Sequence, residues 1–268
     1  MSSNYRFHAG TRGSRPRRLA YLTLYYALYT VLRWGDRHAR ALSILKRLGL
    51  SDAPATVTTP DGLTLELDLH TAFDPLYSIV GLKDYEAEPG FAPLPGWTVV
   101  DLGANLGVFA TRAARLAGPE GRVVAVEPHP DNFRRLEANA RRNALGTLSC
   151  VRAAAGDHEG EAELFVHERG INHSLVRGSG ASVSVRLRTV DALAADLRLS
   201  RVDLLKIDIE GAVPAALRGA AGVIARFKPL IVVEKDDGAE FEGVGAFLEA
   251  AGYARTDRGP LLFARPRR

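Results

Sequence analysis

The chain has 268 residues, of which 46% are hydrophobic and 25% charged, so it is long and apolar enough to bury a full core. This composition excludes an intrinsically disordered chain. The single cysteine, Cys150, excludes an intrachain disulfide, a Cys-rich zinc site and a disulfide-stapled secreted scaffold. A reducing, cytoplasmic location is the simplest prediction.

The formal net charge of +4 is spread unevenly along the sequence. Residues 1–50 carry ten Lys and Arg residues against one acidic residue, Asp36, whereas the remainder of the chain is mildly acidic. We therefore expect any anionic partner to be met by this N-terminal segment.

Within this segment, an uncharged run of 14 residues extends from Leu19 to Leu32. It is shorter than the roughly 20 residues that span a bilayer, and its four tyrosines and the charged residues behind it disfavour a cleaved signal peptide. Two interpretations stay open. Residues 1–48 form an interfacial helix on an anionic membrane at the inner face, or they pack on the main domain or on a second subunit in a homo-oligomer.

Residues 51–96 read as a lead-in to the main domain. Two alternating β runs flank the turn Pro60-Asp61-Gly62 in residues 55–70, which predicts a hairpin. Residues 70–86 then read as a short helix and loop. We thus divide the chain into an N-terminal segment (1–50), this lead-in (51–96) and a main domain (97–268).

From Trp97 onward, apolar runs alternate with helical patterns. The predicted strands cover 98–103, 122–128, 148–155, 202–210 and 230–236, and the predicted helices cover 109–117, 130–144, 191–197, 213–227 and 240–251. This alternation predicts an α/β fold in which helices cover both faces of a mostly parallel sheet. Residues 161–168 and 182–190 read as an antiparallel excursion, and residues 252–266 as an antiparallel pair that closes the sheet.

The stretch VVDLGANLGVFA, Val99–Ala110, has the form of a nucleotide-binding turn between a strand and a helix. Gly103 and Gly107 allow a tight turn and a close approach of backbone to a ligand. Asn105 stands where the dinucleotide fingerprint has its second glycine. A side chain at that position argues against a pyrophosphate and favours a ligand without phosphate at the turn.

Three acidic residues follow successive predicted strands, and together they outline a ligand. Asp101 at the first strand is placed to face an ammonium group or to anchor the loop. Glu127 closes the second strand, where an acid accepts hydrogen bonds from ribose hydroxyls. Asp157 follows the third strand and is suited to an adenine amine. A ligand with an amine, a ribose and an adenine but no phosphate is S-adenosylmethionine.

These residues also carry a family resemblance. Tyr85-Glu86, VVDLGANLGVFA, VVAVEPHPDNFRRLEANARRNAL, AAAGDHEG, TVDAL, LLKIDIEGAVPAALRGA and PLIVVEK occur in the order found in FkbM-type S-adenosylmethionine-dependent methyltransferases. The chain resembles that family over about residues 80 to 236 and not over the first 50. The resemblance implies a class I, Rossmann-like methyltransferase fold, a cofactor-binding role for Glu86, and methyl transfer to a hydroxyl oxygen of a sugar, polyketide or other small natural product.

The sequence departs from the family pattern at two places. Val213 stands two residues after the glycine of DIEG, where the family usually has glutamate. The loop after the third strand, usually rich in Asn and Ser, reads INHSLV and adds His173, which we associate with the acceptor or its deprotonation.

An alcohol acceptor must lose its proton, so we look for a base where the strand ends converge. Asp208 and Glu210 are two residues apart after the fourth strand, and in extended geometry both point to one side. One of them orients the cofactor or the acceptor and the other acts as base, with His173 as a further candidate. In the alternative, Glu210 caps the next helix and Lys206 neutralises the pair.

Further candidates for the base are Glu234, after the fifth strand, and His129. Asp208, Glu234 and Asp236 could together supply oxygen ligands to Mg²⁺, but nothing in the sequence fixes their spacing, so we expect no metal.

Three rival functions are weaker. A nucleic-acid methyltransferase is supported by the basic segment alone, because DIEG stands where base-flipping enzymes of this fold have an Asn/Asp-Pro-Pro-aromatic tetrad. A non-catalytic scaffold is supported only by Val213, and Asn105 disfavours an NAD-linked oxidoreductase. The sequence does not name the acceptor, which we expect to be a small molecule, glycan or lipid.

Overall fold

The computed structural model describes residues 6–8, 44, 54–59, 61–68, 85, 88–165, 181–235 and 241–267. The chain divides into two compact units, Met1–Val80 and Gly81–Arg268. Among the described residues, no helix is long and apolar enough to cross a membrane. The predicted uncharged run at 19–32 and the predicted helix at 70–86 lie outside these residues, except for Tyr85.

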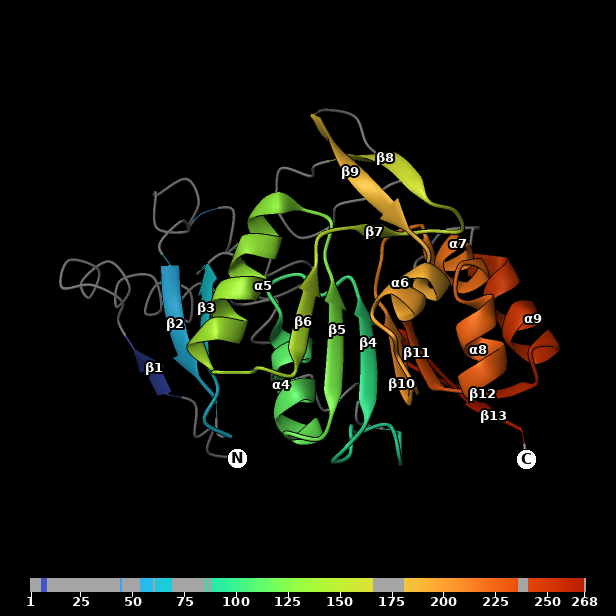
Figure 1. Cartoon of the computed structure of the whole chain (residues 1–268), viewed down its shortest axis with the longest axis horizontal. Coiled ribbons are helices and arrows are strands. Elements are labelled where there is room, and N and C mark those ends of the chain that lie inside the picture. Colours follow the sequence, from blue (N-terminus) through green and yellow to red (C-terminus); the bar gives the residue numbers. More distant parts are fainter. Residues whose placement is uncertain are drawn as a thin grey trace. The chain divides into compact units, whose positions relative to one another are not determined.

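The first unit contains a three-stranded antiparallel sheet in the order β1-β2-β3 (Figure 1). Its strands are β1 (Arg6–His8), β2 (Pro54–Thr58) and β3 (Thr64–Asp68). The predicted hairpin is confirmed as β2–β3, with Gly62 in the left-handed conformation that its turn requires (φ 82°). Strand β1 was not predicted, because three residues in an Arg/Gly/Ser-rich stretch give no alternating pattern.

The second unit is built on a seven-stranded sheet in the order β12-β13-β11-β10-β4-β5-β6. Its strands are β4 (Thr98–Leu102), β5 (Arg122–Val126), β6 (Leu148–Val151), β10 (Leu204–Ile207), β11 (Leu230–Glu234), β12 (Tyr253–Arg258) and β13 (Leu261–Pro266). Five of these strands are parallel, and β13 runs antiparallel to both β11 and β12. The predicted parallel sheet with an antiparallel closing pair is therefore confirmed.

Helices cover both faces of this sheet. They are α4 (Val108–Ala117), α5 (Pro130–Arg142), α6 (Val190–Asp196), α7 (Val213–Arg218), α8 (Ala221–Phe227) and α9 (Glu242–Ala250). Val100, Val124 and Leu205 share one buried cluster with residues of α6 to α9. The alternate side chains of β4 and β5 face the other side, where α4 contacts both strands. The strands are buried on both faces, which is why they read as continuous apolar runs.

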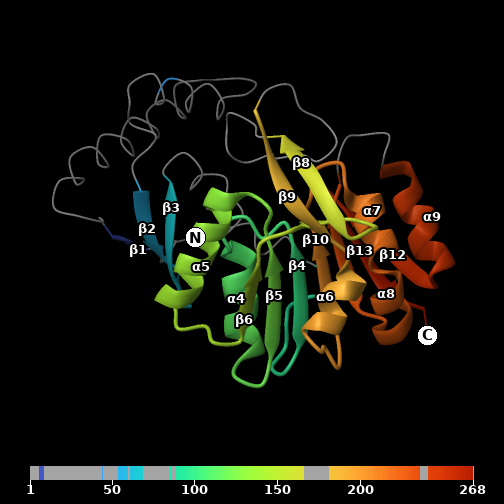
Figure 2. The same ribbon diagram turned by 45° about the horizontal axis from the view of Figure 1, so that its top comes forward.

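The predicted third strand, 148–155, is wrong in one respect. It breaks after Val151, and Ala154–Ala155 form a separate strand, β7, which pairs with β9 (Ser182–Arg188) in a second sheet of order β7-β9-β8. Strand β8 is Gly160–Phe165, and its antiparallel pairing with β9 confirms the predicted excursion (Figure 2).

The predicted single helix over 213–227 is also wrong, because it is split into α7 and α8 at Gly219. The Gly219 carbonyl accepts a hydrogen bond from Asp191 N (2.9 Å), outside the helix. A Cβ at Gly219 would overlap the Gly156 carbonyl oxygen, so the backbones of these two glycines lie in close contact. A tertiary contact of this kind overrides a continuous helical pattern.

Candidate functional site

The turn after β4 has a backbone that its sequence determines. Gly103, Asn105 and Gly107 all have positive φ angles, of 78°, 50° and 83°. A Cβ at Gly103 would overlap the carbonyl oxygen of Asp208, which follows β10. A Cβ at Gly107 would lie 2.5 Å from Cδ1 of Leu136 in α5. Gly103 is therefore required both by its positive φ and by close packing against β10, whereas at Gly107 the positive φ is the main requirement, and the tight turn that the sequence predicts is confirmed.

Glu127 fastens the same turn from the end of β5. The residue is only 4% exposed, and its two carboxylate oxygens accept hydrogen bonds from Asn105 N (2.8 Å) and His129 N (2.9 Å). Burial raises the pKa of Glu127 to about 7, against the lowering effect of these backbone donors. The Asn132 side chain also hydrogen-bonds to this carboxylate, and the predicted ribose contact stays a prediction.

A buried ion pair joins β4 and β10 beside the turn. Asp101 and Lys206 are directly paired in the register of the two strands, and Lys206 Nζ lies 2.9 Å from Asp101 Oδ1. The two residues are 0% and 2% exposed. Burial alone lowers the pKa of Lys206, but the charges of Asp101 and Asp208 outweigh it and raise the pKa above its ordinary value. The ammonium group is therefore held charged in the core.

Lys206 also contacts Asp208, whose Oδ2 lies 3.1 Å from its Nζ. Residues two apart on a strand share a face, which explains why Lys206 and Asp208 meet. Lys206 therefore neutralises Asp208, which is one part of the alternative interpretation of the sequence, and neutralisation of Glu210 by Lys206 stays a prediction. Lys206 neutralises Asp101 as well. Strand β10 ends at Ile207, and Glu210 lies in the turn before α7. The helix N-cap is Ala212, which makes no side-chain capping bond.

Two residues extend this group toward β11. The Tyr85 hydroxyl lies 3.2 Å from Asp208 Oδ2 and 3.1 Å from Glu234 Oε2. Burial raises the pKa of Tyr85 above its ordinary value, and the charges of Asp208 and Glu234 raise it further. Burial and then the Asp208 charge raise the pKa of Glu234 to about 7. We call Asp101, Lys206, Asp208, Tyr85 and Glu234 the strand-end network.

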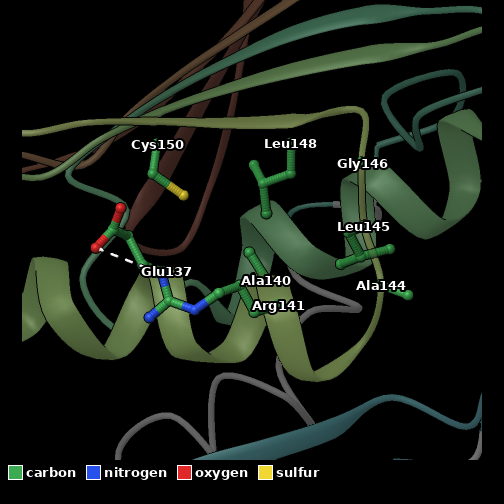
Figure 3. A pocket seen from close by; sticks show the side chains of 8 residues that line it. All are labelled: Glu137, Ala140, Arg141, Ala144, Leu145, Gly146, Leu148 and Cys150. Carbon is green, nitrogen blue, oxygen red and sulfur yellow. Dashed lines mark ion pairs between the residues drawn. The ribbon is translucent and has the colours of Figure 1, made fainter.

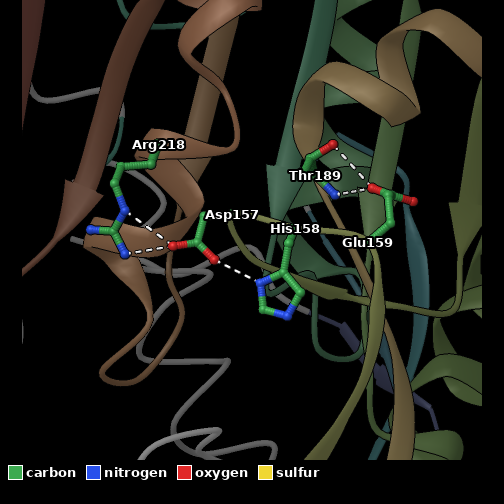
Figure 4. Close-up of polar contacts among 5 residues, drawn as sticks. All are labelled: Asp157, His158, Glu159, Thr189 and Arg218. Carbon is green, nitrogen blue, oxygen red and sulfur yellow. Dashed lines mark hydrogen bonds and ion pairs between the residues drawn. The ribbon is translucent and has the colours of Figure 1, made fainter.

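Among the described residues, Asp157 contacts Arg218 and His158 rather than members of the strand-end network. Its carboxylate pairs with Arg218 of α7, with Oδ2 at 3.1 Å from Nε and 2.7 Å from one terminal nitrogen, and with His158 (Figure 4). The bonds from His158 and Arg218 lower the pKa of Asp157 to about 2. Its carboxylate is ionised and one third exposed, so it can still accept a further hydrogen bond. The predicted adenine contact stays a prediction.

Two buried oxygens beside the glycine turn lack a hydrogen-bond partner among the described residues, Asp101 Oδ2 and Asn105 Oδ1. Such acceptors are costly unless a donor reaches them. A ligand carrying an ammonium group and hydroxyls supplies such donors, so the chemistry of the turn fits the predicted cofactor. Glu86, His173 and Asp236 lie outside the described residues. Within the described part of the chain, no three His, Cys, Asp or Glu side chains are grouped to hold a metal ion.

A separate hollow of about 410 Å³ lies between α5 and the edge strand β6 (Figure 3). Its lining includes Leu148 and Cys150 of β6 with Glu137 and Arg141 of α5. Burial raises the pKa of Cys150 to about 11, so its thiol stays protonated near neutral pH.

Comparison with known protein families identifies the family to which the chain belongs. The model of the methyltransferase FkbM domain matches residues 101–254, which is more than half of the chain. The chain belongs to the FkbM methyltransferase family. The resemblance in the sequence motifs is thereby confirmed, as is the α/β class I methyltransferase fold with its seven-stranded sheet. The cofactor of this FkbM-family protein is S-adenosylmethionine.

Individual relatives of the FkbM-family protein are distant. It is 29% identical over 205 residues to the AMB antimetabolite synthetase AmbE of Pseudomonas aeruginosa, a match that covers 61% of this chain and 10% of AmbE. It is 24% identical over 151 residues to the hexuronic acid methyltransferase AglP of Haloferax volcanii, covering 56% of this chain and 61% of AglP. The chain thus spans less than two thirds of either relative.

Among solved structures, the methyltransferase FkbM of Methylobacillus flagellatus KT is 17% identical, with a TM-score of 0.45, and the match covers 86% of this chain and 60% of that one. A likeness at this level adds nothing to the family assignment.

The sequence missed the partnership of Tyr85 with Asp208 and Glu234. Tyr85 precedes β4, and Glu234 lies 149 residues after Tyr85 at the end of β11, so no local spacing links them. The contact depends on the pairing of β10 with β11, in which Ile207 lies beside Val233. That register sets Asp208 beside Glu234, one residue beyond each.

Proposed function

We propose that this protein is an S-adenosylmethionine-dependent O-methyltransferase that acts on a hydroxyl group of a small molecule, sugar, lipid or natural product. The observation that carries the proposal is the strand-end network. It places three carboxyl groups, those of Asp101, Asp208 and Glu234, at the edge where the glycine turn lies.

The residues around the turn have distinct roles toward the cofactor. The free Oδ2 of Asp101 receives its ammonium group, Gly103 and Gly107 allow the backbone to approach, and Glu127 receives ribose hydroxyls. Asn105, Glu86 and Asp208 complete this site, and Asp157 receives the adenine amine. When bound, the cofactor supplies a methyl group already activated by its sulfonium.

Oxygen is favoured as the methyl acceptor because the side chains at this edge are oxygen bases rather than nucleophiles. A hydroxyl acceptor needs positioning and proton removal, which contribute roughly 7 to 11 kcal/mol and about 10² to 10⁴ in rate. The candidates for these two tasks are Asp208, Glu210, His173 and Glu234. A covalent route through Cys150 is disfavoured, because its thiol is protonated and lines the hollow at α5.

The acceptor class is supported by one relative whose name states its substrate, the hexuronic acid methyltransferase AglP. We propose a sugar or sugar acid as the first class to test. We further propose that the protein acts in the cytoplasm and that residues 1–48 contact an anionic membrane surface, because this segment has ten Lys and Arg residues against one acidic residue, whereas the remainder of the chain is mildly acidic.

A labelling experiment tests the proposal. The purified chain is incubated with S-adenosylmethionine carrying a tritiated methyl group and with four acceptor pools, namely glycosides of uronic acids, neutral sugars, hydroxylated lipids, and RNA with DNA. We expect label in a hydroxylated small molecule or lipid, as a methyl ether that survives mild alkali, whereas the methyl group of a carboxyl ester would be released as methanol. Label that enters only nucleic acid would contradict the proposal.

A further inference from the structure

The strand-end network contains two carboxyl groups in different environments, and this difference bears on which of them takes the acceptor proton. The inference rests on the proposed function. We propose that Glu234 is the catalytic base that receives the hydroxyl proton, whereas Asp208 is a positioning residue that, with Tyr85 and Lys206, orients Glu234 and sets its proton affinity.

Asp208 is poorly suited to be the base because its carboxylate already forms an ion pair with Lys206. Its Oδ2 lies 3.1 Å from Lys206 Nζ and 3.2 Å from the Tyr85 hydroxyl. Burial raises the pKa of Asp208, but Lys206 and the hydrogen bonds outweigh that effect and lower the pKa below its ordinary value. A carboxylate held in this way gains little by taking a proton.

Glu234 differs from Asp208 in its contacts. The ammonium group of Lys206 is bonded to Asp101 and Asp208. Glu234 instead accepts a hydrogen bond from Tyr85, 3.1 Å from Oε2, and shares a side-chain hydrogen bond with Asp208. Glu234 ends β11 and is partly exposed, as Asp208 is, so an acceptor can reach either carboxyl group and the difference between them lies in their partners. When two neighbouring carboxyl groups have different proton affinities because their environments differ, one is suited to act as acid and the other as base.

The charges facing Glu234 explain its affinity for a proton. Burial, the charge of Asp208 and the hydrogen bond that protonated Glu234 donates to Asp208 raise the pKa of Glu234 to about 7, while the Lys206 charge and the Tyr85 hydrogen bond lower it. A base works best when its pKa is near the operating pH, since it is then deprotonated in a large share of molecules and still binds a proton strongly.

The step balances without any other reactant. The acceptor oxygen forms a bond to the methyl carbon as the bond from that carbon to sulfur breaks, and the electron pair of the broken bond stays on sulfur. The hydroxyl proton passes to the Glu234 carboxylate and then to water. The partial exposure of Glu234 provides the route for that release.

A titration of the protein without cofactor or acceptor tests the environment of Glu234. Carboxyl-¹³C glutamate is incorporated into the full chain, and NMR spectra are recorded from pH 4 to 9. We expect two carboxyl resonances with midpoints near 7, belonging to Glu127 and Glu234, and Glu234→Gln removes one of them. Asp208→Asn should lower the remaining Glu234 midpoint, and Tyr85→Phe should raise it.

Glu249→Gln, at an exposed ion pair with Arg255, is the matched control and should leave both midpoints unchanged. The inference is overturned if Glu234→Gln removes only a resonance that titrates near 4.5, or if Asp208→Asn and Tyr85→Phe shift the Glu234 midpoint in the same direction. A loss of folding in Asp208→Asn leaves the Tyr85→Phe shift to decide.

Cofactor affinity separates failure of the inference from failure of the proposed function. By calorimetry, Glu234→Gln should bind S-adenosylhomocysteine within about twofold of the native affinity, while transfer to the acceptor found in the labelling pools falls by about 10² to 10⁴. Glu234→Asp should restore part of the loss. If the native chain neither binds the cofactor nor transfers methyl, the proposed function fails. Undiminished transfer by Glu234→Gln refutes only the role of Glu234.

Discussion

Replacing Gly103 with alanine tests whether the turn after β4 must approach the end of β10. Two costs arise. The backbone of Gly103 has a φ of 78°, a conformation that costs an L-residue roughly 1 to 2 kcal/mol. In addition, the new Cβ would overlap the Asp208 carbonyl oxygen, whereas Cβ atoms in proteins essentially never come within 3.0 Å of a non-bonded heavy atom.

The overlap is with backbone, so no side-chain rotation relieves it. The turn must instead move away from β10 by roughly 1 Å, and since a misplacement of that size in a site costs about 10²-fold in reaction rate, we take the same factor for the loss of affinity. Overpacking adds about 1 to 3 kcal/mol to the loss of stability. We expect S-adenosylhomocysteine affinity, measured by calorimetry, to fall about 100-fold in Gly103→Ala.

Gly118→Ala is the matched control, because Gly118 also has a positive φ, 70°, but a Cβ there meets nothing within 4 Å. It should lose stability from the conformational cost alone, and its cofactor affinity should stay native. Denaturant unfolding of both variants separates the two terms. A Gly103→Ala protein that binds S-adenosylhomocysteine within threefold of native would refute this account of the turn.

Four further predictions follow from other contacts. Lys206→Met should lower the free energy of unfolding in urea by about 3 to 5 kcal/mol, because it leaves Asp101 buried and unpaired; a loss below 1 kcal/mol would contradict this. The pKa of Glu234 is raised to about 7 on folding, so native protein binds more protons than unfolded chain between about pH 4.5 and 7, and stability falls as pH rises through that window. Glu234→Gln should make that fall shallower, and an unchanged slope would count against the shift. Asp157→Ala should weaken S-adenosylhomocysteine about tenfold, as expected for one hydrogen bond to a charged group, but leave the inosine analogue unaffected; equal weakening of both would remove the adenine contact. Deleting residues 1–48 should abolish sedimentation with anionic liposomes while cofactor binding persists, and unchanged sedimentation would refute the membrane proposal.

Much of the fold could be predicted because its signals are local. The parallel strands are buried on both faces, so each gives a continuous apolar run. Helix α5 begins at Pro130, a residue that favours the first position of a helix. The breaks at Val151 and Gly219 could not be predicted. Both arise where β7 leaves the main sheet to pair with β9 and brings Gly156 against Gly219.

The candidate site divides in the same way. The turn glycines and Glu127 stand in one short motif, and the structure places Glu127 against the turn. The strand-end network depends on the order of the strands, since Asp101, Lys206 and Glu234 meet only because β4, β10 and β11 are neighbours. The contact of Arg218 with Asp157 was missed for a similar reason, because the two residues are 61 positions apart in the sequence.

Calorimetric titration of the full chain with S-adenosylhomocysteine, repeated with NAD, tests the central claim that the turn after β4 is a site for S-adenosylmethionine. We expect one S-adenosylhomocysteine to bind per chain with micromolar or tighter affinity, NAD not to bind, and Asp101→Asn to weaken the binding. Tight binding of NAD without binding of S-adenosylhomocysteine would contradict the claim.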